Sequence, residues 1–291
     1  MSQDDLPPLG PGSLLWRYAG DSRIAFLGGT IGLLQLMHPA IGAGVLEHSN
    51  FFEDPFDRVF RSLPAILGAV YDDDPEATGR WVRDQHKTIT GTDSEGRRYH
   101  ALDPATYWWA HATFQFMAEQ VVDRYDDRRL TPAEREQLYL EGVTWYHRYG
   151  VSDRAVPATR ADFQVEWERV CTEVLEVNDA VRYVLHLLDR PLRLELPRPL
   201  GVLNPVLRRS PVARVLRVPV RISAIGGLPA IVRERFDIPW SRADQRQLDA
   251  LELAVRKTWR FVPASQRWQP RALEAWKRVR DERGSRWRAA G

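Results

Sequence analysis

The chain has very little cysteine: Cys171 is the only one among 291 residues. One cysteine cannot form an intramolecular disulfide, complete a four-cysteine zinc site or hold a cysteine-ligated iron–sulfur cluster. A bound metal would therefore depend on the seven histidines and the carboxylates. Cys171 follows an apolar stripe and has no basic cluster beside it, so we expect a core residue rather than a thiolate ligand or nucleophile.

Neither sign of charge is in clear excess. Lysine and arginine number 41 against 39 for aspartate and glutamate, and the formal net charge is +2. With 44% hydrophobic residues, this balance excludes a disordered chain. The arginines of residues 190–235 alternate with proline and leucine rather than with exposed aromatics, so we predict no nucleic-acid partner.

Signals for export and for a membrane span are weak. Asp4 and Asp5 stand where a signal peptide carries basic residues, which predicts a cytoplasmic protein. Residues 24–46 are apolar over a length that could span a bilayer, but His38-Pro39 interrupts them and Gln35 makes their transfer into lipid less favourable. We therefore predict no stable membrane span, and two buried helices that meet at His38-Pro39.

Helix signals recur along the chain, whereas strand signals are scarce. Asp74-Pro75, Asp103-Pro104 and Thr131-Pro132 each place a capping side chain before a proline at the first helical position. An apolar stripe at helical spacing predicts one long helix over residues 160–188, which would be the longest of the chain. Other helices are predicted over residues 54–70, 132–149, 212–225, 229–236, 241–259 and 270–283.

This pattern predicts an all-α fold made of one helical domain. We predict an N-terminal arm over residues 1–20 and the helical core over residues 21–188. Residues 189–291 read as a proline-rich connector followed by C-terminal helices that pack on the core.

Several common catalytic motifs are missing. The chain has no Gly-x-Ser-x-Gly elbow, no His-Glu-x-x-His zinc helix and no Glu-x-x-His pair for a di-iron bundle. Four histidines, His86, His111, His147 and His186, fall within predicted helices. His86 and His111 lie on apolar faces, where a hydrogen-bonded core histidine is the commoner role and ligation of haem iron is the alternative.

Short motifs in a fixed order give a more specific hypothesis. From His38 to Gly150 and beyond, they are His38-Pro39, Gly44-Val-Leu-Glu-His48-Ser49, Asp54-Pro55 with Arg58, Val82-Arg-Asp-Gln-His86 with Gly91, Tyr99-His-Ala-Leu-Asp103-Pro104, Trp109-Ala-His111-Ala-Thr113, Tyr149-Gly-Val, Leu228-Pro-Ala-Ile-Val-Arg233 and Phe236-Asp-Ile-Pro-Trp240-Ser. In this order and spacing, the chain resembles the MpaB and rubber-oxygenase (latex-clearing protein) family of haem b oxygenases.

The resemblance implies a globin-like helical core around a buried b-type haem, with the iron held by one proximal histidine. By its position in the Val-Arg-x-x-His motif, His86 is the implied iron ligand. Arg83, one helical turn earlier, could bind a haem propionate or face solvent. His111 remains a second candidate: it is either a second ligand, which would make the iron six-coordinate, or a pocket and packing residue.

The resemblance also suggests residues on the oxygen-binding side of the haem. Rubber oxygenases carry arginine, then lysine three residues later, then threonine, and Arg58, Arg61 and Ser62 have this spacing. Two of the three differ in type, and an arginine at position 61 stays charged and cannot act as a base. The alternative is an ordinary exposed basic helix face. Glu47 is the nearest candidate for the family's distal glutamate base.

The resulting hypothesis is a haem b-dependent oxygenase, an enzyme that acts with O2 on a hydrophobic, alkene or isoprenoid-like substrate by oxidative cleavage or oxygenation. An alternative is a non-catalytic helical protein that binds haem or a lipid. A third possibility is a haem-free enzyme that kept the fold. With one cysteine in a predicted core, imidazole rather than thiolate ligation of the iron is favoured.

Overall fold

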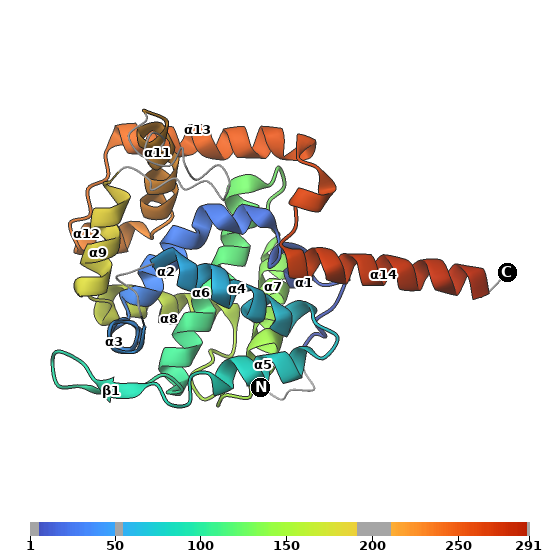
Figure 1. Cartoon of the computed structure of the whole chain (residues 1–291), viewed down its shortest axis with the longest axis horizontal. Coiled ribbons are helices and arrows are strands. Elements are labelled where there is room, and N and C mark those ends of the chain that lie inside the picture. The colour runs from blue at the N-terminus through green and yellow to red at the C-terminus, as the bar shows by residue number, and fades with distance from the viewer. Residues whose placement is uncertain (1–5, 50–54, 191–210, 290–291) are drawn as a thin grey trace, which may run out of the picture.

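The computed structural model describes residues 6–49, 55–190 and 211–289, and within them the side chains of all but residues 55–61, 211–217 and 283–289. The described chain is mostly helical, which confirms the all-α prediction (Figure 1). The strands described are β1 (Thr90–Thr92) and β2 (Arg98–His100), which pair as an antiparallel hairpin with Gly91 opposite Tyr99. This hairpin was not predicted.

The helices follow one another with short connections. In chain order they are α1 (Leu14–Tyr18), α2 (Gly28–Leu36), α3 (Pro39–His48), α4 (Pro55–Tyr71), α5 (Pro75–Asp84), α6 (Pro104–Tyr125), α7 (Pro132–His147), α8 (Arg160–Arg169), α9 (Asp179–Leu188), α11 (Pro211–Gly226), α12 (Ala230–Arg235), α13 (Arg242–Thr258) and α14 (Pro270–Ala289). Short 3-10 segments, at Ser22–Leu27, Trp259–Phe261 and Ala264–Gln266, and a π-helical turn, at Val170–Val174, complete the described elements.

The three predicted helix starts are confirmed by their caps. Asp74 accepts a hydrogen bond from Ala77 N at the start of α5, and Asp103 accepts from Ala105 N at the start of α6. At the start of α7, Thr131 and Glu134 form the reciprocal capping box. These local interactions satisfy backbone donors that the first helical turn leaves unpaired.

The apolar run of residues 24–46 is broken as predicted. The segment Ser22–Leu36 and α3 meet at His38 with a bend of 98°. In the described part of the chain, no single helix is long and apolar enough to cross a membrane, although this bent pair passes the same test by length and composition. The cytoplasmic location stays a prediction.

The long helix predicted over residues 160–188 is wrong. The structure has α8, the π-helical turn Val170–Val174 and then a separate helix, α9. The break comes from polar contacts with the end of α2: Asn178 Nδ2 donates to Leu36 O at 2.7 Å, and Glu176 N donates to Met37 O at 2.8 Å. Asn178 also caps α9 by accepting from Val181 N. The longest helix described is α6, with 22 residues.

The core forms around α6, which runs through the middle of the molecule (Figure 1). It packs against the first helices, α7 and α13, and residues along its whole length are buried. Large aromatic side chains fill the space between these helices, and the largest fully buried ones are Tyr71, Tyr125, Tyr139, Trp145 and Tyr146. The buried Cys171 lies in the same helical body, and burial raises the pKa of its thiol to about 12, so the predicted core role is confirmed.

Helices α4 and α5 form an antiparallel hairpin, because only residues 72–74 join them (Figure 1). Gly68 of α4 faces Thr78 of α5 so closely that a Cβ at Gly68 would lie 2.8 Å from Thr78 Cγ2. This contact lies three residues from each end of the connection, so the two helices touch where the hairpin turns.

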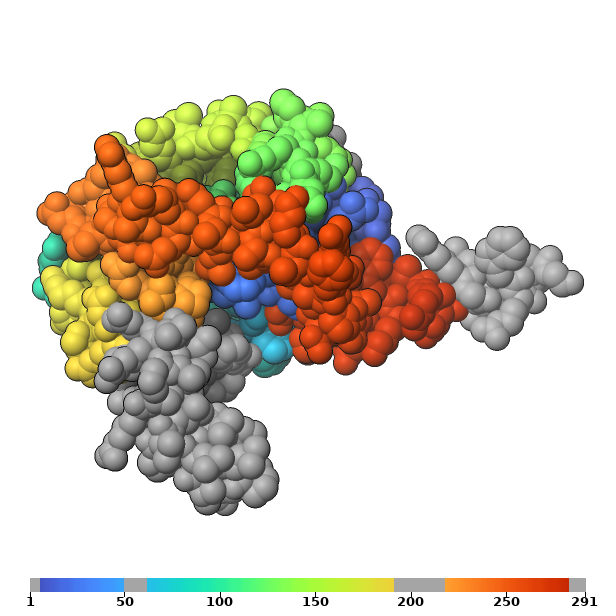
Figure 2. Space-filling view, turned by 90° about the horizontal axis from the view of Figure 1, so that it is seen from above, coloured from blue at the N-terminus to red at the C-terminus, as the bar shows by residue number. Residues whose placement is uncertain are grey.

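The C-terminal helices pack on the core at two places. Helix α13 lies against α6 and α11, and α14 begins beside α4 and then leads away from the body (Figures 1 and 2). Helix α11 crosses α2, where Thr30 Oγ1 donates to Ala224 O at 2.9 Å. A Cβ at Gly227 would collide with Thr30 Oγ1, so glycine allows this close approach. The proline-rich connector is predicted over residues 190–211, of which residues 191–210 lie outside the described residues.

Candidate functional site

His86 lies in the turn that follows α5 and not inside a helix as predicted. Its backbone N–H still donates to Arg83 O at 2.9 Å, which continues the last helical turn. Its Nδ1 lies 2.8 Å from Val82 O. A carbonyl oxygen only accepts, so Nδ1 carries the hydrogen and Nε2 carries the lone pair. Histidines that bind metals commonly have this arrangement, because the carbonyl fixes the tautomer and orients the ring.

The ring of His86 is half-buried and packs against α6. It contacts Tyr107 of α6, whose ring centroid lies 5.8 Å away with the two planes at 87°. Tyr107 in turn contacts Tyr149 at 5.5 Å and Tyr146 at 6.2 Å. Burial raises the pKa of the Tyr107 hydroxyl well above its usual range, so this residue stays protonated. His86 therefore stands at the edge of the aromatic core.

The predicted Arg58, Arg61 and Ser62 all lie on α4. The side chains of Arg58 and Arg61 lie outside the described residues, and Ser62 is half-buried. Helix α4 is joined to α5, and α5 leads to His86, so these predicted residues and His86 belong to the two arms of one helical hairpin.

Arg83 is engaged in two interactions. Its guanidinium bonds Asp84 through Nε at 2.8 Å, and one terminal nitrogen donates to Gly150 O at 3.3 Å. The Arg83 and Lys87 side chains both bond the exposed Asp84 carboxylate, and these contacts lower the pKa of Asp84. Arg83 thus links the end of α5 to the turn after α7.

Glu47 lies at the end of α3, beside the β hairpin. Its carboxylate accepts a short hydrogen bond from the hydroxyl of Tyr99 on β2. Burial and this bond raise the pKa of Tyr99 to about 12, so the tyrosine remains the donor. Gly91 of β1 packs against the same pair, and a Cβ there would collide with both groups. Half of the Glu47 side chain, 53%, is exposed, so the carboxylate can exchange protons with water.

His111 has a different environment. It lies within α6 and is 2% exposed, and its Nε2 donates to Gly142 O of α7 at 2.8 Å. Its Nδ1 is buried and has no hydrogen-bond partner among the described residues. Burial lowers the pKa of His111 to about 3, so the imidazole is neutral. The ring is in contact with four aromatic side chains, which are those of Trp108, Trp145, Tyr146 and Tyr149.

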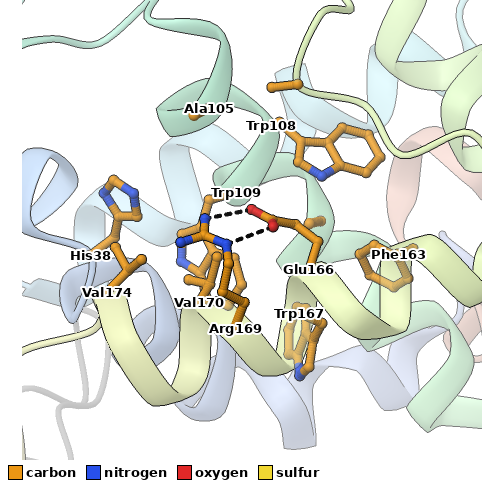
Figure 3. A pocket seen from close by; sticks show the side chains of 12 residues that line it. His38, Ala105, Trp108, Trp109, Phe163, Glu166, Trp167, Arg169, Val170 and Val174 are labelled. Atoms are coloured by element: carbon orange, nitrogen blue, oxygen red, sulfur yellow. Dashed lines mark hydrogen bonds and ion pairs between the residues drawn. The ribbon is translucent and has the colours of Figure 1, made fainter.

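A third histidine, His38, is also buried, although the sequence predicts it only as a helix break and a motif residue. The structure places it at the start of α3, beside Trp109 of α6, where burial lowers its pKa to about 4. It lines a cavity of about 120 Å³ between α6 and α8 (Figure 3). Its burial could not be predicted from the sequence, because it depends on helices that lie far away in the chain.

Neither the histidines nor the carboxylates gather into a larger metal centre. Among the described residues, no group of three or more histidine, cysteine, aspartate or glutamate side chains could hold a metal ion. The arrangement around His86 is instead that of one imidazole donor at the edge of a helical aromatic core. One donor of this kind suits a cofactor that brings most of its own ligands.

A comparison with known protein families identifies the family of the chain. The chain matches the family described as ER-bound oxygenase mpaB/B'/Rubber oxygenase, catalytic domain, over residues 16–260. The match covers most of the chain, so the protein belongs to this family, and the predicted resemblance is confirmed. No curated protein and no solved structure matches the chain. Family membership indicates an oxygenase.

Proposed function

We propose that the protein is a haem b-dependent oxygenase that acts with O2 on a small hydrophobic, alkene or isoprenoid-like substrate, by oxidative cleavage or oxygenation. Membership of the oxygenase family supports the reaction class. The helical core that we assign to haem lies within residues 21–188, and we place the enzyme in the cytoplasm. The observation that carries the proposal is the environment of His86.

His86 has the donor chemistry that a proximal ligand needs. Its Nδ1–H bond to Val82 O fixes the ring and the tautomer, so Nε2 is the nitrogen that would bind iron, and the carbonyl increases the basicity of that nitrogen. The edge of Tyr107 supports the ring on one side. The residues present therefore fit a haem held through His86 Nε2. When bound, haem b supplies redox-active iron at which O2 is activated.

The other predicted residues take supporting roles in this proposal. Arg58 and Arg61 supply positive charge on α4, and Arg83 supplies it at the end of α5, where each can pair with a propionate or donate to an oxygen atom. Ser62 offers a half-buried hydroxyl on the same helix as Arg58 and Arg61. The aromatic side chains behind Tyr107 exclude water from one side of the site.

Glu47 is the proposed proton acceptor. Tyr99 donates to its carboxylate and holds it in one orientation, while its exposed side can receive a proton from substrate or water. The second oxygen of the carboxylate does the accepting, because the first is already bonded to Tyr99. His111 is assigned to packing rather than to iron, since its Nε2 is occupied by Gly142 O.

Absorption spectroscopy of the purified protein tests the assignment. We expect a Soret band that is lost in His86→Ala and retained in His111→Gln, whose amide can still donate to Gly142 O. A pyridine haemochrome assay on the same samples measures bound haem directly. A colourless protein that takes up no added haemin would contradict the haem assignment.

The alternative of a non-catalytic haem or lipid carrier is separated by oxygen uptake. The reduced, haem-loaded protein is mixed with an unsaturated isoprenoid lipid, and dissolved O2 is followed with an electrode. We expect consumption that depends on the lipid and decreases in Glu47→Gln. Haem binding with no lipid-dependent consumption would favour the carrier.

A further inference from the structure

Helix α14 lies beyond the part of the chain that matches the oxygenase family, because the match ends at residue 260 and the helix begins at Pro270. It starts beside α4 and then leads away from the body (Figure 1). Its first turns are packed: Ala272 and Ala275 are buried, and Trp276 contacts Trp16 of α1 edge to face, with 6.2 Å between the ring centroids. The start of α14 therefore belongs to the folded core.

The turn between α4 and α5 carries three carboxylates in succession, which are those of Asp72, Asp73 and Asp74. Like charges this close repel one another, so the turn needs cations or hydrogen-bond donors nearby. Asp74 caps α5 by accepting from Ala77 N, and Asp72 accepts from Thr78 Oγ1 at 2.8 Å. These neutral donors leave the negative charge of the turn to be balanced from another part of the molecule.

Two arginines of α14 supply the balancing charge. Arg271 forms an ion pair with Asp72. Arg278 pairs with Asp73 at 2.9 Å, and it also donates to Tyr71 O at the end of α4. The two arginines are seven residues apart, which is two helical turns, so they lie on one face of α14. That face therefore holds the turn of the α4–α5 hairpin.

Helix α5 has little anchoring of its own. It is 10 residues long, and its buried residues are Gly79 and Val82. A helix this short is marginal in isolation, so its position depends on its tertiary contacts. Near His86, Arg83 connects α5 to Gly150 O through one contact of 3.3 Å. The opposite end of α5 is the turn that α14 holds.

We propose that α14 acts as a strap on the turn of the α4–α5 hairpin, and that Arg271 and Arg278 are positioning residues for α5. Without both arginines, the charge of the turn is unbalanced and α5 opens locally, while the rest of the core stays folded. Because α5 leads directly to His86, the strap also fixes the place of that imidazole. This last step rests on the proposed function, in which His86 binds haem iron.

Hydrogen exchange of the haem-free, full-length protein, followed by mass spectrometry, tests the strap. In Arg271→Gln/Arg278→Gln, we expect the amides of residues 75–86 to exchange about 10-fold faster, while those of α6 and α13 change by less than about 3-fold. Lysine keeps the positive charge, so Arg271→Lys/Arg278→Lys should exchange within about 3-fold of the unchanged protein. Arg280→Gln is the matched control, because Arg280 is 76% exposed and pairs with Asp281 on α14 itself.

An unchanged exchange rate in α5 of the double glutamine variant would overturn the proposal. Equal acceleration in all helices would also overturn it, because the two arginines would then stabilise the whole fold rather than the hairpin. So would an acceleration of α5 in Arg280→Gln that equals the one in the double glutamine variant.

The rate of haem loss tests the link to His86. Haem-loaded protein is mixed with an excess of a haem-free globin, and the transfer is followed at the Soret band. We expect the double glutamine variant to lose haem several-fold faster than Arg280→Gln, and equal rates would overturn the link. If the protein binds no haem while α5 still responds to the substitutions, the proposed function fails and the strap stands.

Discussion

His86 and His111 make the same kind of bond with opposite nitrogens. His86 uses Nδ1, 2.8 Å from Val82 O, and His111 uses Nε2, 2.8 Å from Gly142 O. The lone pair of His86 is therefore on Nε2, at the tip of the ring, whereas that of His111 is on Nδ1, next to its own backbone and within a cluster of aromatic rings. A buried histidine is thus not equivalent to a ligand: the nitrogen that the backbone occupies decides which role is open.

The largest effect expected from this difference is on haem binding. We expect His86→Gly to lower haem affinity by at least about 100-fold, because it removes the iron ligand itself, and added imidazole to restore the Soret band by filling the vacated space. The measurement is a haemin titration with and without imidazole. In His111→Gly, imidazole should make no difference to haem content. Rescue in that variant instead would reverse the two assignments.

The next largest effect is on the free energy of unfolding, which we expect to fall more in the His111 variant than in the His86 variant. We expect His111→Ala to lower the free energy of unfolding by about 3 kcal/mol, since it opens a cavity among buried aromatics and leaves Gly142 O unpaired. His86→Ala should cost only about 1 kcal/mol, because its ring is half-buried at the edge of the core. Urea unfolding of the haem-free proteins gives both values. A larger loss for His86→Ala would contradict the comparison.

The pH dependence of stability is the third test. His111 has a pKa of about 3 in the folded protein and an ordinary value of about 6.5 when unfolded. Between these values the unfolded chain binds a proton that the folded chain does not, so this stability is present above pH 6.5 and is lost as the pH falls. Urea unfolding at pH 7 and pH 5 should show it. In His111→Gln, the free energy of unfolding should fall less steeply with decreasing pH, by up to about 1.4 kcal/mol per pH unit. Equal slopes would mean that His111 is not the group responsible.

The smallest effect is expected for Arg83. Its ion pair with Asp84 is partly exposed, and such pairs contribute less than about 1 kcal/mol to stability. We expect Arg83→Gln to change the free energy of unfolding by less than about 0.5 kcal/mol while weakening haem binding several-fold, if a propionate is its partner. A haemin titration beside urea unfolding separates the two effects. A stability loss without a change in haem affinity would assign Arg83 to structure alone.

Local signals predicted much of the fold. The starts of α5, α6 and α7 followed from Asp74, Asp103 and Thr131, because an N-cap interaction lies within a few residues of its partner. The end of α8 did not follow, since the break depends on Asn178 bonding Leu36 O across 142 residues of sequence. The β hairpin was missed because three-residue strands carry almost no periodic pattern.

The candidate site, too, could be predicted only in part from the sequence. The family motif identified His86, but only the structure shows the Val82 carbonyl that selects its nitrogen. The burial of His38 was not predictable, because the side chains around its ring come from α6 and α8. Sequence patterns report which residues share a helix face, whereas a site depends on which helices meet.

The crossing of α2 and α11 has a consequence for synthesis of the chain. Thr30 bonds backbone oxygens that lie 193 and 194 residues further along, and Gly29 packs on Ala224 at the same crossing. The ribosome adds residues one at a time, so the side of α2 that carries Gly29 and Thr30 lacks its α11 partner until α11 has emerged. For most of translation this surface is exposed to other nascent chains. Helix α2 is therefore the segment where we expect a chaperone to bind during synthesis, and where truncated chains would begin to aggregate.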